Sequence, residues 1–178
     1  MLQSKARWKV SEPEPRAVAE LAAGLKLQPV VAKLLVSRGF TDLQEADRFL
    51  KGGTDCFHDP FLMDGMEKAV SRIRKALDSG EKIRIYGDYD ADGVSSTSLM
   101  IHLMRKLNAD FDYYIPHRAT EGYGLNHNAV KLAADSGVSL IVTVDTGISA
   151  WEQVEYASEL GIDVVVTDHH EPPERLPD

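Results

Sequence analysis

The spacing of apolar side chains changes near residue 80, and this change divides the chain into two predicted parts. In the first part, Leu21, Leu25 and the cluster at 30–35 recur at the spacing of amphipathic helices, and nothing alternates like a strand. The same helical spacing returns over 63–77. We therefore predict a small helical lead-in or cap over residues 1–80.

The ends of these predicted helices carry signals of their own. Gly39 and the pair Ser79-Gly80 are typical helix stops, because glycine readily takes the left-handed conformation that ends a helix. Thr41 followed by Gln44 is a capping-box signature. It predicts a short helix that opens there and runs through Leu50.

After residue 80, short β-branched runs alternate with amphipathic segments. This is the pattern of βαβ units, whose strands pair in a mostly parallel sheet covered by helices. The predicted strands lie at 82–86, 111–115, 140–144 and 163–167. The predicted helices lie at 94–107, 126–136 and 150–160. We therefore predict an α/β domain of Rossmann-like class, with flanking helices, over residues 81–178.

Composition and charge narrow the class of protein without deciding its function. The apolar runs are far shorter than the roughly 20 residues that cross a bilayer, and the opening MLQSKARWKV lacks the apolar stretch of a secretory signal. We therefore predict a cytoplasmic protein with no membrane contact. The net charge of −8 argues against simple electrostatic binding of nucleic acid, but clustered aspartates that hold cations would attract phosphate.

Acidic and imidazole side chains follow three of the four predicted strands. In an open parallel sheet, ligands bind at the carboxyl ends of the strands, where loops lead into helices. The side chains expected at that edge are Asp88, Asp90, Asp92, Asp145, His169 and His170. So many carboxylates in one cleft repel one another unless cations neutralise them. We therefore predict a site for Mn²⁺ or Mg²⁺, with ligands enough for two ions and with Asp145 placed to bridge them.

Structural interpretations of the same motifs are weaker. Residues 88–93 begin like a calcium-binding EF-hand loop, but its twelfth position is Leu99 rather than glutamate, and a strand precedes it. Taken alone, the segment 145–147 is more often a helix cap, and only its place after a buried strand favours a ligand role. We treat the isolated histidines as structural; they are His58, His102, His117 and His127.

Two further candidates lie between the second predicted strand and the next helix. Arg118 is suited either to a bidentate phosphate contact or to a surface salt bridge. The glycines that flank Tyr123 suit a turn in which the ring stacks on a base, or simply a flexible turn. Both interpretations of each residue stay open.

Three motifs, each after a β-branched run, resemble the DHH phosphoesterase superfamily. They are YGDYDADG at 86–93, VDTG at 144–147 and TDHH at 167–170. Four further phrases are similar to the RecJ branch of that superfamily, and they are WKVSEPEP, RGFTDLQEADRFL, FHDPFLMDGMEKAV and HRATEGYGLN. The resemblance extends over essentially the whole chain.

The resemblance implies a two-metal phosphoesterase that removes nucleotides from the 5′ end of single-stranded DNA in repair and recombination. It assigns Asp90 and Asp92 to one metal each, Asp145 to a bridge and His169 to the second metal. These four residues would form the metal site of a DNA exonuclease.

Other side chains receive supporting roles from the same resemblance. His170 would face the scissile phosphate. Arg118 and Tyr123 stay weaker candidates for substrate contacts on their position alone, as argued above. Asp88 and Asp168 would orient the metal ligands, as carboxylates behind ligating groups commonly do.

The sequence departs from the superfamily pattern in two places. A histidine is frequent four residues before Asp90, but this chain has Tyr86, which implies a first metal that is bound more weakly or through water, or a site that holds a single metal. The chain ends at Asp178, before a fourth acidic motif and a DNA-binding module, so we expect a fragment with little activity of its own. Rival functions are an oligonucleotide or cyclic-dinucleotide phosphodiesterase, a pyrophosphatase of the same superfamily, and a metal-binding module without catalysis.

Overall fold

The computed structural model describes residues 9–10 and 12–178. Predictions that concern residues 1–8 and 11, namely the opening decapeptide and part of the WKVSEPEP phrase, lie outside the described residues. The chain forms two compact units, Met1–Leu62 and Met63–Asp178. No helix of the described residues is long and apolar enough to cross a membrane.

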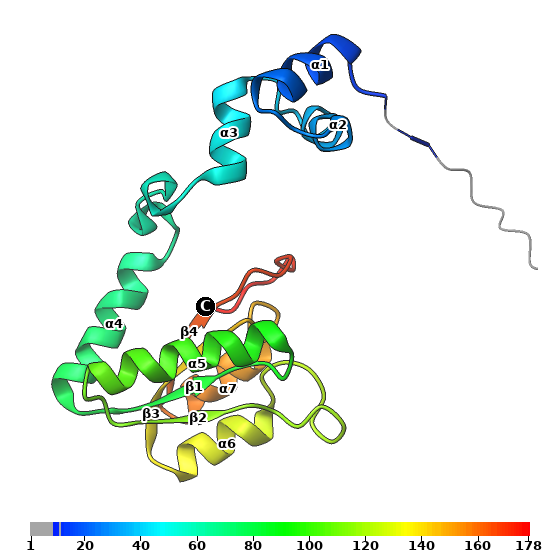
Figure 1. Ribbon diagram of the computed structural model, residues 1–178. Helices are drawn as coiled ribbons and strands as arrows, with labels where there is room; N and C mark the ends of the chain where they lie inside the picture. The colour runs from blue at the N-terminus through cyan, green and yellow to red at the C-terminus, as the bar shows by residue number, and fades with distance from the viewer. Residues whose placement is uncertain (1–8, 11) are drawn as a thin grey trace, which may run out of the picture. The chain divides into compact units, whose positions relative to one another are not determined.

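The first unit is helical, as predicted. It contains α1 (Pro15–Gly24), α2 (Pro29–Ser37), α3 (Leu43–Lys51) and the short 3-10 helices η1 (Thr54–Cys56) and η2 (Pro60–Leu62) (Figure 1). Its small core consists of Leu21, Ala32, Leu35 and Ala46. The N-terminal cap of α3 is Asp42, one residue after the predicted Thr41. The Asp42 side chain accepts hydrogen bonds from the backbone N–H groups of Gln44 and Glu45.

The second unit is an α/β domain built on four parallel strands in the order β2-β1-β3-β4 (Figure 1). The strands are β1 (Lys82–Tyr86), β2 (Phe111–Tyr114), β3 (Val138–Val144) and β4 (Asp163–Thr167). The helices are α4 (Met66–Ser79), α5 (Ala91–Lys106), α6 (His127–Asp135) and α7 (Trp151–Glu159). All four predicted strands are present, so the predicted fold class is confirmed.

Helices cover both faces of this sheet, and alternate strand residues point to opposite sides. Ile83 and Ile85 of β1 face a cluster that includes Met104 of α5, whereas Tyr86 faces a cluster that includes Val130 of α6. This division into two cores follows from the two-residue period of a strand. The central strand β3 is buried on both faces, and its sequence VSLIVTV is correspondingly almost continuously apolar.

Helix α4 belongs to the second unit, whereas the sequence placed the boundary after it, at residue 80. Its apolar stripe, including Ala69 and Ile73, packs against the core under β1 and β3. Arg72 of α4 also donates to Asp163 Oδ2 at 2.5 Å and to Glu81 Oε2 at 2.6 Å. The helical period predicted the element correctly but could not reveal which unit its apolar face would cover.

Candidate metal centre

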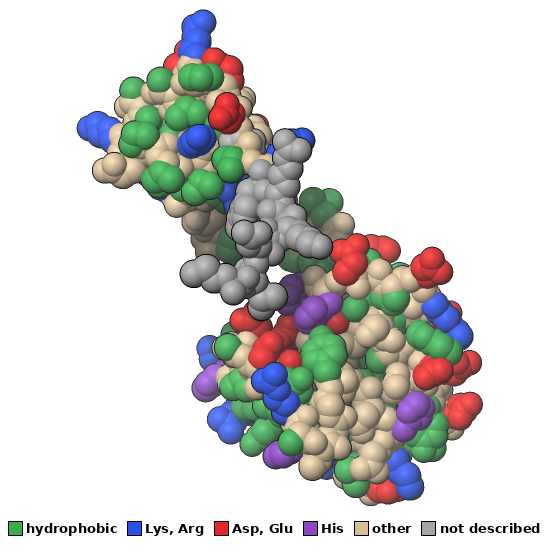
Figure 2. Space-filling model, turned by 90° about the vertical axis from the view of Figure 1, so that its right-hand side faces the viewer, with side chains coloured by type: hydrophobic (Ala, Val, Ile, Leu, Met, Phe, Trp, Pro, Cys, Tyr) green, Lys and Arg blue, Asp and Glu red, His purple; other side chains and the backbone are tan. Residues whose placement is uncertain are grey.

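The polar loops after β1, β3 and β4 meet at the carboxyl edge of the sheet. Strand register brings Tyr86 beside Thr143 and Val144 beside Thr167, so the residues that follow these strands emerge next to one another. The Asp145 N–H donates to the carbonyl of Thr167 at 3.1 Å, which extends this pairing into the loop. In Figure 2 two histidines lie beside acidic side chains near the top of the larger unit, and other acidic and histidine side chains are spread over the rest of the visible face.

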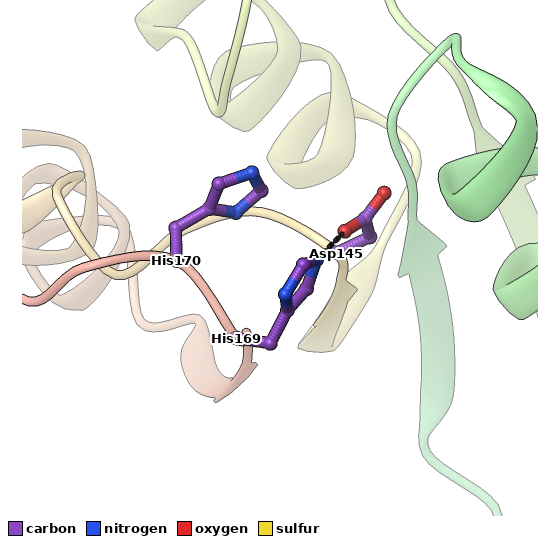
Figure 3. A group of neighbouring side chains, drawn as sticks. All are labelled: Asp145, His169 and His170. Atoms are coloured by element: carbon purple, nitrogen blue, oxygen red, sulfur yellow. Dashed lines mark hydrogen bonds and ion pairs between the residues drawn. The ribbon is translucent and has the colours of Figure 1, made fainter. Parts of the chain in front are cut away.

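Asp145 and the two adjacent histidines form one group of possible metal ligands (Figure 3). One ligand atom from each of Asp145, His169 and His170 lies within 4.8 Å of the others. His169 Nε2 and Asp145 Oδ1 are 2.9 Å apart. The Asp145 side chain is nearly buried, whereas both imidazoles are exposed and can meet a ligand from solvent.

Asp168 lies behind this group and orients it. Its Oδ2 accepts the Ile148 N–H at 2.9 Å, and its Oδ1 lies 2.6 Å from His170 Nδ1. Burial alone would raise the pKa of Asp168, but the hydrogen bonds from the Ile148 N–H and from His170 bring it below its ordinary value. The hydrogen bond to Asp168 in turn raises the pKa of His170. The imidazole is therefore held by an ionised carboxylate.

Asp88, Asp90 and Asp145 form a second group of possible ligands, so Asp145 is common to both. Asp90 Oδ1 caps α5 by accepting the N–H groups of Asp92 and Gly93 at 2.9 and 3.0 Å. Asp88 is buried, and its Oδ1 has no hydrogen-bond partner in the described part of the chain. An orphaned buried carboxylate oxygen is costly, and a cation would satisfy it.

The electrostatics of the two groups reflect uncompensated negative charge. Burial raises the pKa of Asp145, and the neighbouring Asp90 carboxylate raises it further against the opposing hydrogen bond with His169. The N–H groups of Gly93 and Asp92 lower the pKa of Asp90. Oxygen donors with imidazole suit Mn²⁺ or Mg²⁺, so the residues present fit the predicted ions.

Asp88 and Asp92 are placed differently from the roles that the resemblance implied. Asp88, expected only to orient ligands, lies with Asp90 and Asp145. Asp92 lies in the first turn of α5 and is exposed, outside both groups of ligand atoms. It does border the cavity that Asp145 and His169 line. The difference arises because α5 begins directly after Asp90, so the helix carries Asp92 away while the loop turns Asp88 inward.

The structure brings Tyr123 to the centre and Arg118 to a residue beside it. The Tyr123 hydroxyl lies 3.3 Å from His170 Nδ1, and the Arg118 guanidinium lies 5.2 Å from the ring centre of Tyr89. Tyr86 does not face the ligand groups, because its hydroxyl donates to the carbonyl of Gly124. Sequence reasoning missed Tyr89, whose only signal was its position between two of the motif aspartates.

The isolated histidines stay outside the ligand groups, as expected. His117 Nδ1 lies 3.2 Å from the Thr120 hydroxyl, and the His127 ring packs 5.1 Å from Tyr156. Among the described residues, neither these two nor His58 or His102 belongs to a group that could hold a metal.

Comparison with known proteins places these motifs in a family context. Residues 82–178 match the model of the DHH family, N-terminal domain. The chain is 51% identical over all 178 residues to the single-stranded-DNA-specific exonuclease RecJ of Bacillus subtilis, of which it covers 23%. It is 43% identical over 153 residues to RecJ of Escherichia coli, covering 26% of that protein. The chain thus spans about a quarter of the length of these relatives.

Solved structures of similar proteins share the fold. A manganese-bound exonuclease RecJ is 37% identical with a TM-score of 0.61, over 65% of this chain and 30% of the other. RecJ of Thermus thermophilus, in complex with Mn²⁺, is 29% identical with a TM-score of 0.69, over 94% of this chain and 23% of the other. Both likenesses extend the match from sequence motifs to the arrangement of the backbone.

Proposed function

The chain belongs to the DHH family, and from this premise we propose that it is the metal-binding part of a single-stranded-DNA exonuclease that hydrolyses phosphodiester bonds from the 5′ end. The observation that carries the proposal is Asp145, which is shared by two groups of ligand atoms. A carboxylate common to two groups is what a pair of neighbouring metal ions requires. The names of the RecJ relatives support the choice of substrate.

We assign ligands to two ions of Mn²⁺ or Mg²⁺. Asp88, Asp90 and Asp145 would hold the first. The Asp88 oxygen without a hydrogen-bond partner would take the place of the histidine ligand that is frequent at the position of Tyr86, whose hydroxyl is bonded to Gly124. Asp145 and His169 would hold the second, and Asp92 borders the same cavity without belonging to either group of ligand atoms. The metal-bound RecJ structures support this choice of ions.

Bound divalent cations would supply Lewis acidity, which lowers the pKa of water and neutralises charge that develops on phosphate. The chain's own side chains would orient the substrate. The hydrogen bond that His170 Nδ1 donates to Asp168 would hold the exposed ring of His170 toward the phosphate side of the centre. Arg118 would bind a phosphate oxygen, and the half-exposed ring of Tyr123 would stack on a base.

An assay on 5′-labelled single-stranded oligonucleotides tests the proposal. The full-length protein should release nucleotides with Mn²⁺, and Asp90→Ala and Asp145→Ala should each abolish the release. Asp110→Ala is the matched control, because this exposed aspartate precedes β2 at the opposite edge of the sheet. Unchanged release by both site variants would refute the proposal.

Substrate choice separates the rival functions. Faster turnover of dinucleotides or pyrophosphate than of long single strands would favour another activity of the superfamily. Release from 3′-labelled ends would overturn the proposed polarity. We further propose that the activity serves repair and recombination of DNA in the cytoplasm, which a repair defect after loss of the gene would support.

A further inference from the structure

The loop at residues 115–126, between β2 and α6, is held from beneath by two tyrosines that the proposed metal centre does not use. The buried ring of Tyr86 stacks on Tyr114, with ring centres 5.5 Å apart. The Tyr86 hydroxyl donates to the Gly124 carbonyl at 2.9 Å, and the Tyr114 hydroxyl donates to Glu121 Oε1 at 2.5 Å. Both hydrogen bonds end on the loop, so both tyrosines tie it to the sheet.

Glu121 closes the loop on itself. Its Oε2 accepts the His117 N–H at 2.7 Å, and its own N–H donates to the His117 carbonyl at 2.9 Å. The hydrogen bond from His117 and that from Tyr114 lower the pKa of Glu121, while the same contact with Glu121 raises the pKa of Tyr114 to about 12. At neutral pH the carboxylate is therefore an ionised double acceptor, a strong class of hydrogen bond.

Side chains next to these anchors reach two different parts of the metal centre. Arg118 follows His117 and lies over Tyr89, the residue between Asp88 and Asp90. Tyr123 precedes Gly124 and contacts His170 through its hydroxyl. The loop therefore touches both the first and the third motif, and its conformation sets where each side chain stands.

We propose that Tyr86, Tyr114 and Glu121 are positioning residues that hold the 115–126 loop as a preformed substrate surface beside the metal centre. The inference rests on the proposed function, since it assumes that this surface meets single-stranded DNA. Preformed contact surfaces avoid the ordering cost of binding. Loss of an anchor therefore weakens substrate binding more than the chemical step, and it leaves metal binding intact.

Amide hydrogen exchange tests the anchoring itself, independently of activity. In Glu121→Ala, exchange over residues 117–125 should rise about tenfold or more, the effect of losing hydrogen bonds to one charged group. Glu121→Gln, which keeps one acceptor oxygen, should show a smaller rise. Tyr113→Phe is the matched control, because this exposed tyrosine of β2 makes no hydrogen bond to the loop.

Steady-state kinetics of the full-length protein test the positioning role. Tyr86→Phe and Glu121→Ala should raise KM for a single-stranded oligonucleotide about tenfold, with a smaller change in kcat and an unchanged midpoint for Mn²⁺ binding. If the anchors act through the loop, Glu121→Ala should add little to the effect of Tyr123→Ala in the double variant, because coupled residues are not additive.

The outcomes separate this inference from the proposed function. Unchanged exchange in Glu121→Ala, additive effects in the double variant, or a parallel loss of Mn²⁺ binding would each overturn the positioning role. If the wild-type protein releases no nucleotide, the proposed function fails, and the exchange experiment still decides whether the anchors hold the loop.

Discussion

At the two ends of the parallel sheet in the second unit, aspartates differ in whether a basic side chain of the chain neutralises them. In the amino-terminal half, Asp112 of β2 receives a bidentate contact from Arg84, with both distances 2.7 Å. Asp163, the first residue of β4, receives Arg72 from α4. Both of these aspartates are therefore paired with an arginine of the chain.

At the carboxyl edge, no basic side chain neutralises the aspartates in this way. Within the described residues, no lysine or arginine forms a salt bridge with Asp88, Asp90 or Asp145, and one Asp88 oxygen has no partner at all. Asp112 and Asp163 thus have cations supplied by the chain, whereas the three carboxylates at the carboxyl edge do not, which is what we expect of the proposed metal ligands.

The largest expected effect comes from Asp145→Asn in the full-length protein. Nucleotide release should fall on the order of a thousandfold, while stability without metal should not decrease. Because burial raises the pKa of Asp145, its ionised form is disfavoured in the folded state, and a neutral isostere removes that cost. Single-turnover assays and urea unfolding in EDTA measure the two effects. A large loss of stability would mean that this aspartate is structural after all.

Metal addition is the second way to test the comparison. Mn²⁺ at about one hundred times its dissociation constant should stabilise the chain by about 2.7 kcal/mol, because it binds only the folded state. The gain should disappear in Asp145→Ala, which removes the carboxylate shared by both groups of ligands, and persist in Asp110→Ala. Thermal unfolding with Mn²⁺, against EDTA and against NaCl at matched ionic strength, measures it. An equal gain in the Asp145 variant would place the ions elsewhere.

Arg72→Ala probes the amino-terminal half, where the effect should fall on stability alone. Removal of the guanidinium leaves Glu81 and Asp163 without their partner, and we expect a loss of about 1–2 kcal/mol, since Asp163 is largely exposed. Mn²⁺ binding should not change. Arg74→Ala, on the exposed face of the same helix, is the control. Weakened Mn²⁺ binding in Arg72→Ala would contradict the division of roles.

The smallest effect concerns pH. Burial alone would raise the pKa of Asp112, but the hydrogen bonds from Arg84 and Lys82 lower it below the ordinary value. A depressed pKa contributes stability above the unfolded-state pKa of about 3.9, and this contribution is lost as pH falls through the folded-state value. The difference in unfolding free energy between wild type and Asp112→Asn should therefore shrink below about pH 4. A constant difference would argue against the ion pair.

The spacing of apolar residues predicted most of the helices and strands, and the differences between prediction and structure have local causes. The strands were predictable because β-branched runs such as residues 141–144 are buried on both faces of the sheet. Helix α5 begins three residues before its predicted start, because Asp90 caps the helix. The prediction began later because Gly93 interrupts the apolar pattern of the sequence. The predicted boundary at residue 80 and the division into compact units after Leu62 differ by helix α4, because period alone does not say what an amphipathic face will cover.

The candidate site was predictable as a gathering of loops but not in its details. Parallel strands bring their carboxyl ends together, so the proximity of Asp145 to His169 followed from the motif order. Which aspartate of the first motif turns inward depends on loop backbone that no pattern encodes. The hydrogen bond from Tyr86 to Gly124 joins residues 38 positions apart, beyond any local signal.

The backbone of Asp145 limits how this centre can be redesigned. Its φ of 61° lies in the left-handed region, which aspartate and asparagine enter more readily than other residues with a Cβ atom. Glutamate at this position would have to adopt the same left-handed backbone conformation. Its longer side chain would also move the carboxylate away from the other ligands of both groups. A variant designed to change the preferred metal ion should therefore alter the neighbouring ligands and keep Asp145, the ligand common to both groups.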